Sequence, residues 1–125
     1  MSDKENMHTN TFNIRQAVPA DVKLILQFIQ KLGAYEKLSH EVVATEEKLR
    51  KTLFEQKMAE VIIGEYKGEA VGFALYFHNY STFLGQAGIY LEDLFIDPGM
   101  RGKGFGKKML AHLAKLAVER DCGRL

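Results

Sequence analysis

This 125-residue sequence has no tryptophan, one cysteine and two prolines, and its net charge is close to zero. The single cysteine, Cys122, excludes an internal disulfide. Seventeen lysines and arginines against sixteen acidic residues leave a formal charge of +1, so the chain has no overall attraction to nucleic acid or anionic membranes. No apolar run approaches the roughly 18 residues of a membrane helix, and residues 1–10 lack the apolar core of a secretion signal. We therefore expect a cytoplasmic protein without nucleic-acid or membrane partners.

The spacing of apolar residues predicts an α/β fold. Alternating and β-branched stretches predict strands, whereas apolar residues three and four positions apart predict amphipathic helices. The first helix should end at Gly33, in a left-handed conformation. We expect residues 1–11 to form a flexible tail and residues 12–125 to belong to a single domain. The predicted strands are 12–17, 59–66, 70–80 and 87–96, and the predicted helices begin near residues 19 and 45 and after residue 106.

A glycine-rich turn, Arg101-Gly-Lys-Gly-Phe-Gly106, joins the last predicted strand to the last helix. Backbone N–H groups and the positive end of the helix dipole converge at such a turn, which favours a phosphate or pyrophosphate. Arg101, Lys103, Lys107 and Lys108 add positive charge. The alternative is a tight turn with solvated lysines and no ligand.

Two familiar phosphate motifs do not fit this turn. A P-loop requires glycine where Arg101 stands and serine or threonine where Lys108 stands. A dinucleotide fingerprint requires glycine or alanine at Lys107 and an early place in the chain. A nucleotide-binding protein of either kind is therefore disfavoured.

Two adjacent acids, Glu92 and Asp93, lie in the middle of the last predicted strand. We expect Glu92 to point inward and to act in catalysis or substrate binding, since ionisable groups inside strands cluster at functional sites. The alternative is that strand alternation buries one acid in a structural network and exposes the other. The four histidines have no metal-ligand spacing, so no metal site is predicted.

These features together resemble the GNAT acetyltransferase superfamily. Its acyl-coenzyme A site has the pattern Arg/Gln-x-x-Gly-x-Gly/Ala at the start of a helix, which residues 101–106 match. The segments Tyr90-Leu-Glu-Asp-Leu-Phe95 and Val71-Gly-Phe-Ala-Leu-Tyr76, with Tyr35-Glu36 after the first helix, resemble the diamine (spermidine/spermine) N-acetyltransferase branch. The resemblance covers roughly residues 12–125. It implies a mixed, mainly antiparallel sheet with flanking helices.

The resemblance also implies the reaction and the site. Acetyl would pass from acetyl-CoA, as co-substrate, to a primary amine of a small polyamine, diamine or lysine-like substrate, by direct attack in a ternary complex. The backbone near Phe95, at Leu94 and Ile96, would pair with the pantetheine arm. The residues around the amine would be Tyr35, Glu36, Glu92 and Asp93, and those of the acyl-coenzyme A turn Arg101, Gly102, Lys103, Gly104, Phe105, Gly106 and Lys107.

Amine chemistry requires a group that removes a proton. A primary amine with a pKa of about 10.4 is almost wholly protonated at neutral pH and cannot attack a thioester. Glu92 is the candidate general base, directly or through a water. A backbone N–H near Leu94, freed by a bulge or splay in the strand, is the candidate donor to the oxyanion.

The family pattern continues beyond the residues present here. A fifth strand and a helix with a catalytic tyrosine, the general acid, would follow near Leu125. We therefore expect either a piece of a longer acetyltransferase, with the C-terminal strands missing, or a homodimer in which a partner copy covers the last strand. A non-catalytic acyl-CoA-binding or regulatory module is the alternative function.

Overall fold

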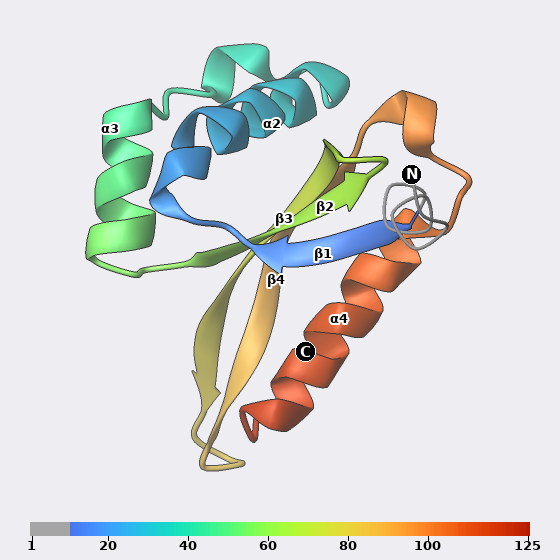
Figure 1. The fold of residues 1–125 in the computed structure, drawn as a ribbon. Helices are drawn as coiled ribbons and strands as arrows, with labels where there is room; N and C mark the ends of the chain where they lie inside the picture. Colours follow the sequence, from blue (N-terminus) through green and yellow to red (C-terminus); the bar gives the residue numbers. More distant parts are fainter. Residues whose placement is uncertain (1–10) are drawn as a thin grey trace.

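The computed structural model describes residues 11–125, and the strands in this range form one antiparallel sheet of four. Each strand pairs with the next along the chain, so β1 and β4 lie at the two edges (Figure 1). The four predicted strands are confirmed, with ends that differ by no more than one residue. The predicted tail lies almost wholly outside the described residues and stays a prediction. The strands are β1 (Phe12–Gln16), β2 (Glu60–Tyr66), β3 (Glu69–Ser81) and β4 (Gln86–Ile96).

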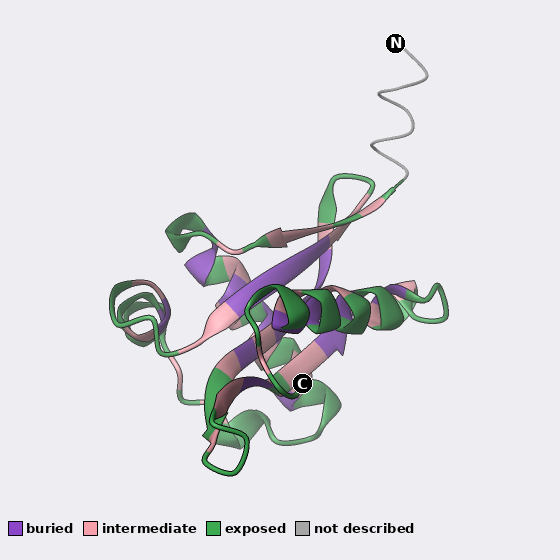
Figure 2. Ribbon diagram, turned by 90° about the horizontal axis from the view of Figure 1, so that it is seen from below, coloured by how far each residue is buried: buried purple, intermediate pink, exposed green. Residues whose placement is uncertain are grey.

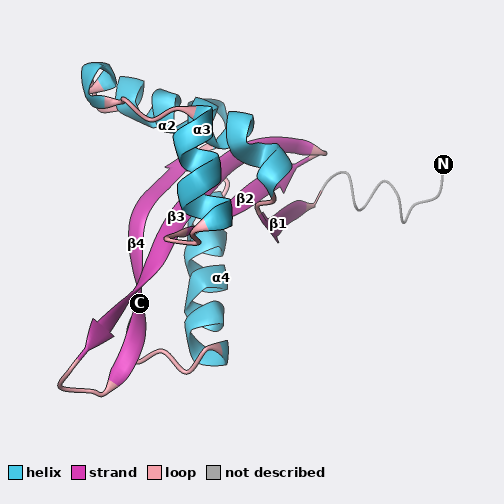
Figure 3. Cartoon of the chain, turned by 90° about the vertical axis from the view of Figure 1, so that its left-hand side faces the viewer, coloured by secondary structure: helices cyan, strands magenta, loops and turns pink. Residues whose placement is uncertain are grey.

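Helices cover both faces of this sheet. α2 and α3 lie on one face and α4 lies on the other (Figure 1, Figure 3). The predicted α/β class with flanking helices is therefore confirmed. The helices are α2 (Val22–Tyr35) after the short turn η1 (Pro19–Asp21), α3 (Glu46–Leu49) continued by the π-helical η3 (Arg50–Glu55), and α4 (Phe105–Glu119), with short 3₁₀ turns η2 (Ser39–Glu41) and η4 (Pro98–Met100).

The predicted end of the first helix at Gly33 is wrong. Gly33 is buried within α2, which continues to Tyr35, and the left-handed residue after the helix is Lys37, with φ of 60°. A Cβ at Gly33 would lie 2.7 Å from Cγ2 of Val42. The glycine therefore allows the loop after α2 to pack closely against the helix, rather than ending it.

The sheet separates two hydrophobic cores. Buried residues run along the central strands and along the inner sides of the helices (Figure 2). The core beneath α4 is centred on Ile62, Ala74, Tyr76, Met109 and Leu113. The core beneath α2 and α3 contains Val22, Ile25, Phe28, Val61, Ile63, Phe73 and Phe95.

A β-bulge interrupts the pairing of β3 with β4 at Glu92. Asp93 pairs with Leu75 and Leu91 pairs with Tyr76, so Glu92 is an extra residue in β4. The extra residue changes which face the following side chains occupy. Ile89 and Leu91 before the bulge pack toward α4, as Leu94 and Ile96 do after it. The bulge therefore moves Asp93 and Phe95 to the α2 side.

Two arginine–carboxylate pairs tie the elements together. Arg15 on β1 donates two hydrogen bonds to the carboxylate of Asp21, at 2.7 and 2.9 Å, and the backbone N–H of Val18 donates to the same carboxylate. Arg120, after α4, donates two hydrogen bonds to Glu60 on β2, at 2.6 and 2.9 Å. The arginine in each pair holds the pKa of its partner carboxyl below the usual range. Asp21 and Glu60 therefore have a structural role.

Candidate active site

The turn between β4 and α4 has the geometry of an anion site. Gly102 and Gly104 have φ of +83° and +80°, a conformation that favours glycine. Gly104 is the residue before α4, and no side chain caps the helix there. The first N–H groups of a helix have no partner inside it. They therefore point out of the start of α4, where its dipole attracts an anion.

An aromatic contact fixes the position of this helix start. Phe105 is 5% exposed, and its ring stacks on that of Phe12 at 4.2 Å with an angle of 8° between the ring planes. The ring of Tyr66 lies 5.0 Å from that of Phe105. β1 and β2 therefore hold the first residue of α4 in place, and the glycine turn is held between this anchor and the end of β4.

A cleft of about 400 Å³ opens beside the turn. It brings together most of the residues predicted for the acyl-coenzyme A site. Met100, which the sequence analysis did not select, also contributes to the wall, and its place between the strand and the turn was the only signal available. The cleft is lined by Tyr35, Leu94, Ile96, Met100, Arg101, Gly102, Gly104, Phe105 and Gly106.

Three other predicted residues do not line this cleft. Phe95 is buried in the core beneath α2, on the opposite face from α4, so its side chain is structural. Lys103 and Lys107 are exposed on the turn and the first turn of α4. They supply positive charge near the cleft without forming its wall.

The end of β4 directs backbone groups of Leu94 and Ile96 toward its free edge. The N–H of Asp97 donates to the carbonyl of Val71 on β3, at 2.7 Å. Because backbone groups alternate along a strand, those of the preceding residue, Ile96, and of Leu94 point away from β3. The carbonyl of Ile96 already accepts a hydrogen bond from Nε of Arg101, at 2.9 Å. The backbone of Leu94 has no neighbouring strand in the described part of the chain.

The other half of this edge has a neighbour. The N–H of Gly123 donates to the carbonyl of Ala87 at 2.9 Å, and the N–H of Ile89 donates to the carbonyl of Arg124 at 3.0 Å. The residues after α4 therefore run beside the first half of β4 in the same direction. The predicted mixed sheet has this parallel contact beside four antiparallel strands.

Three acidic residues, Glu36, Glu92 and Asp93, form a second part of the site, which we call the acidic group. Burial raises the pKa of Asp93, and the negative charges of Glu92 and Glu36 raise it further. The inward orientation predicted for Glu92 is wrong: Glu92 is exposed at the bulge, and Asp93 is the half-buried acid. The acidic group does not line the cleft, but Asp93 directly precedes Leu94 in β4.

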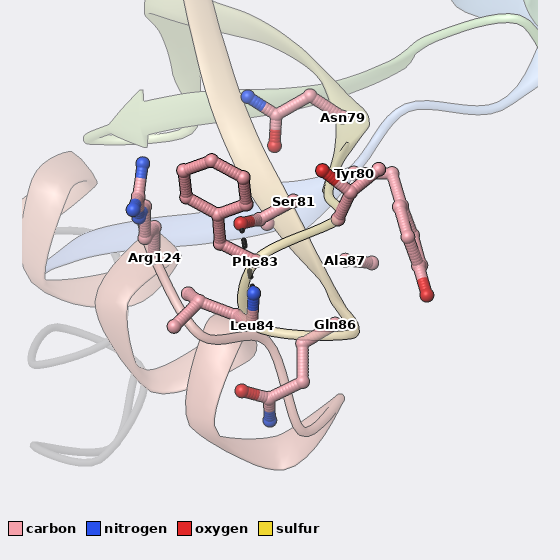
Figure 4. A pocket seen from close by; sticks show the side chains of 10 residues that line it. Asn79, Tyr80, Ser81, Phe83, Leu84, Gln86, Ala87 and Arg124 are labelled. Carbon is pink, nitrogen blue, oxygen red and sulfur yellow. Dashed lines mark hydrogen bonds between the residues drawn. The ribbon is translucent and has the colours of Figure 1, made fainter.

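A separate pocket of about 280 Å³ lies at the other end of β4, around the β3–β4 hairpin. Figure 4 shows the rings and polar groups around it, with Phe83 and Arg124 on the same side. Phe83 is 99% exposed, and Ser81 Oγ accepts a hydrogen bond from the N–H of Leu84, at 3.2 Å. None of the predicted site residues lines this pocket.

Residues 11–125 contain neither a cluster of potential metal ligands nor a helix suited to a membrane. No group of three potential metal-ligating side chains occurs there. No helix in this range is long and apolar enough to cross a membrane.

Comparison with known proteins decides the family. Residues 26–125 match the Acetyltransferase (GNAT) family. The chain belongs to the GNAT acetyltransferase family. The glycine turn and the strand order of this GNAT domain are therefore the expected family features, and the predicted family is confirmed.

Individual relatives agree with this family. The GNAT domain is 39% identical to a thialysine N-epsilon-acetyltransferase of Bos taurus, over 90% of this chain and 71% of the relative. It is 29% identical to a human spermidine/spermine N(1)-acetyltransferase-like protein 1, over 89% of this chain and 17% of that protein. These similarities agree with the diamine-acetyltransferase branch. They support an acetyltransferase enzyme over the non-catalytic module.

A solved structure gives the same fold. The crystal structure of a ribosomal-protein-alanine N-acetyltransferase from Brucella melitensis has a TM-score of 0.75 and 18% identity, covering 92% of this chain and 77% of that one. At this identity the likeness concerns the fold alone.

Proposed function

We propose that the enzyme moves acetyl from acetyl-CoA to a primary amine of a diamine, a polyamine or a lysine-like substrate. The observation that carries the proposal is the pairing of a glycine turn suited to a pyrophosphate with an acidic group suited to a cation, both beside the second half of β4. Named relatives act on thialysine and on spermidine or spermine, which fits amines that carry a second positive charge.

The residues at the turn fit the acyl donor. The helix start has no capping side chain, and a Cβ at Gly102 or Gly104 would occupy open space, where a ligand oxygen must approach. The backbone N–H groups of the turn would hold the pyrophosphate, with Arg101 and Lys107 beside them. The carbonyl of Leu94 and the N–H of Ile96 would pair with the pantetheine arm. Acetyl-CoA supplies an activated acetyl group as a thioester.

The acidic group would attract and deprotonate the amine. A cationic substrate lowers the mutual repulsion of three carboxylates. Glu92, exposed at the bulge, is the proposed general base, directly or through a water, and Asp93 beside it helps to orient the ammonium group. The neutral amine then attacks the thioester directly in a ternary complex. Holding the two reactants together contributes most of the rate enhancement.

The bulge also serves the oxyanion. It disrupts the regular ladder beside Leu94, whose N–H points toward the free edge of β4. This N–H is the proposed donor to the negative oxygen that forms during attack. The base and the oxyanion donor would thus be placed by the same irregularity in one strand.

A homodimer is proposed on the basis of the open edge. The second half of β4 has no neighbouring strand among the described residues, and open strand edges favour pairing with another chain, so a partner copy would lie beyond the pantetheine arm and cover this edge. We further propose that the enzyme works in the cytoplasm, where its co-substrate would be acetyl-CoA.

The test compares two glycines that have nearly the same backbone angle φ. Gly104 and Gly68, in the β2–β3 turn, have φ of +80° and +79°, and a Cβ at either position meets no atom within 4 Å. Gly104→Val should weaken coenzyme A binding about tenfold or more, equivalent to about 1.4 kcal/mol. Gly68→Val places valine at the same positive φ, away from the cleft, and should leave affinity unchanged. Calorimetry measures both.

Two results would contradict the proposal. Unchanged affinity in Gly104→Val would remove the turn from the site. An equal loss in both variants would assign the effect to backbone strain instead of to the ligand.

A further inference from the structure

Arg101 is held at the cleft by three contacts, two from the end of β4 and one from the end of α2. Its Nε donates to the carbonyl of Ile96 at 2.9 Å. Its guanidinium carbon lies 4.2 Å from the ring centre of Tyr35 and 5.4 Å from that of Phe95. Tyr35 in turn packs edge-on against Phe95, with ring centres 6.5 Å apart and an angle of 69°. The last residue of α2 therefore covers the side chain that begins the glycine turn.

The charge of Arg101 has no acidic partner within residues 11–125. Arg15 and Arg120 each donate two hydrogen bonds to one carboxylate, whereas Arg101 forms no ion pair with another described residue. The Nε hydrogen bond uses one of five N–H donors. The guanidinium carbon of Arg101 lies over the Tyr35 ring, and a guanidinium held in this way still has terminal N–H groups that can donate hydrogen bonds. The terminal N–H groups are thus left for an anion at the turn.

Tyr35 lies where it can limit the freedom of this side chain. An arginine side chain has considerable rotamer freedom, which a ligand must otherwise restrict when it binds. Tyr35 is 59% exposed, so its ring gains little from burial in the core, and the ring contacts Arg101 and Phe95. Its position suits a residue that orders Arg101 before the ligand arrives.

We propose that Tyr35 is a positioning residue for the acyl-donor site, which it affects by holding Arg101 in place. This inference rests on the proposed use of acetyl-CoA. It differs from the role that the family resemblance implies, in which Tyr35 lies around the amine. Substitution of Tyr35 should therefore change the affinity for coenzyme A and the KM for acetyl-CoA more than the KM for the amine.

The test distinguishes the contribution of the Tyr35 ring to coenzyme A affinity from that of its hydroxyl. Tyr35→Leu should weaken coenzyme A binding about three- to tenfold by calorimetry, whereas Tyr35→Phe, which keeps the aromatic face, should stay within about twofold of the parent. Tyr90→Leu is the matched control, because Tyr90 is another half-exposed tyrosine (49%) and its ring contacts Phe77, away from Arg101. It should leave affinity unchanged.

A double-mutant cycle connects the effect to Arg101. In an Arg101→Leu background, Tyr35→Leu should cause no further loss of coenzyme A affinity, because the group that it positions is gone. The side-chain NMR signals of Arg101 in the free protein give a second readout. Ring-current shifts from Tyr35 should persist in Tyr35→Phe and disappear in Tyr35→Leu.

The outcomes are distinguishable. If the parent protein binds no coenzyme A, the proposed function fails. If the parent binds and Tyr35→Leu binds equally well, or if its loss persists unchanged in the Arg101→Leu background, only the positioning role is overturned. A loss in Tyr35→Phe as large as that in Tyr35→Leu would assign the effect to the hydroxyl and would also overturn it.

Discussion

Asp21 and Glu60 differ from the acidic group at Glu36, Glu92 and Asp93 in what surrounds their charge. Each of the first two carboxylates accepts two hydrogen bonds from an arginine, which lowers its pKa. Asp93 instead is surrounded by partial burial and two further negative charges, which raise its pKa. The same chemical group therefore has opposite effects on stability in the two places.

This difference indicates which charges the fold needs. An arginine fork makes an ionised carboxylate favourable in the folded state, so Asp21 and Glu60 stabilise it. An acid whose pKa is raised is unfavourable in its charged form, so at neutral pH it lowers the stability of the folded state. Such unfavourable groups are typical of binding and catalytic sites.

The largest expected effect is on catalysis, from Glu92→Gln. Loss of a general base should lower kcat about 100-fold at neutral pH. Raising the pH should rescue part of this loss, because more of the amine is then already neutral. The measurement is a pH–rate profile of the variant and the parent. If the pH–rate profiles of the variant and the parent overlay, Glu92 is not the general base, and only a role in substrate binding remains for it.

The next effect is on stability, from Asp21→Asn. Removing the charge from two arginine hydrogen bonds should lower the free energy of unfolding by about 2 kcal/mol, less than for a fully buried pair because Arg15 is partly exposed. Arg15 lowers the folded-state pKa of Asp21, so this stabilisation is present above the unfolded-state pKa and is lost as the pH falls through the lower folded-state value.

Urea unfolding of parent and variant over a range of pH measures this effect. The difference between them should shrink in acid, and the kcat of the folded variant should match the parent. A loss of activity without a loss of stability would show that Asp21 belongs with the acidic group.

The smallest expected effect is a gain in stability, opposite in sign to the loss expected for Asp21→Asn. Asp93→Asn should raise the Tm at neutral pH by a few degrees, because it removes a carboxylate whose ionised form is unfavourable in the fold. The gain should be full above the raised folded-state pKa and should vanish as the pH falls below the unfolded-state value. Glu69→Gln, at an exposed position on β3, is the control for the loss of one charge. A lower Tm in Asp93→Asn would contradict the comparison.

Most of the fold could be predicted because it depends on local patterns. Alternation and helical spacing located all four strands and the three main helices, since each element has one face toward a core. The end of α2 could not be predicted in this way. Gly33 is a good helix-ending residue by type, but its place is decided by the side chain of Val42, nine residues later, which packs against it.

The site was predictable in part for the same reason. The glycine turn is a local motif, and its residues line the cleft together. The predicted inward orientation of Glu92 is wrong because simple alternation assumes an uninterrupted strand. The bulge depends on how β4 pairs with β3, which the sequence of β4 alone does not indicate. The contact between Tyr35 and Arg101 joins residues 66 positions apart, and no spacing in the sequence indicates it.

The bulge at Glu92 also divides β4 into two segments of opposite phase. Core residues facing α4 occupy odd positions before Glu92 and even positions after it. Leu91 and Asp93, on either side of Glu92, pair with the adjacent residues Tyr76 and Leu75. Deletion of Glu92 would therefore close the strand into a regular ladder in which Ile89, Leu91, Leu94 and Ile96 all keep their places beneath α4. The core does not need this extra residue; the irregular backbone beside the site does.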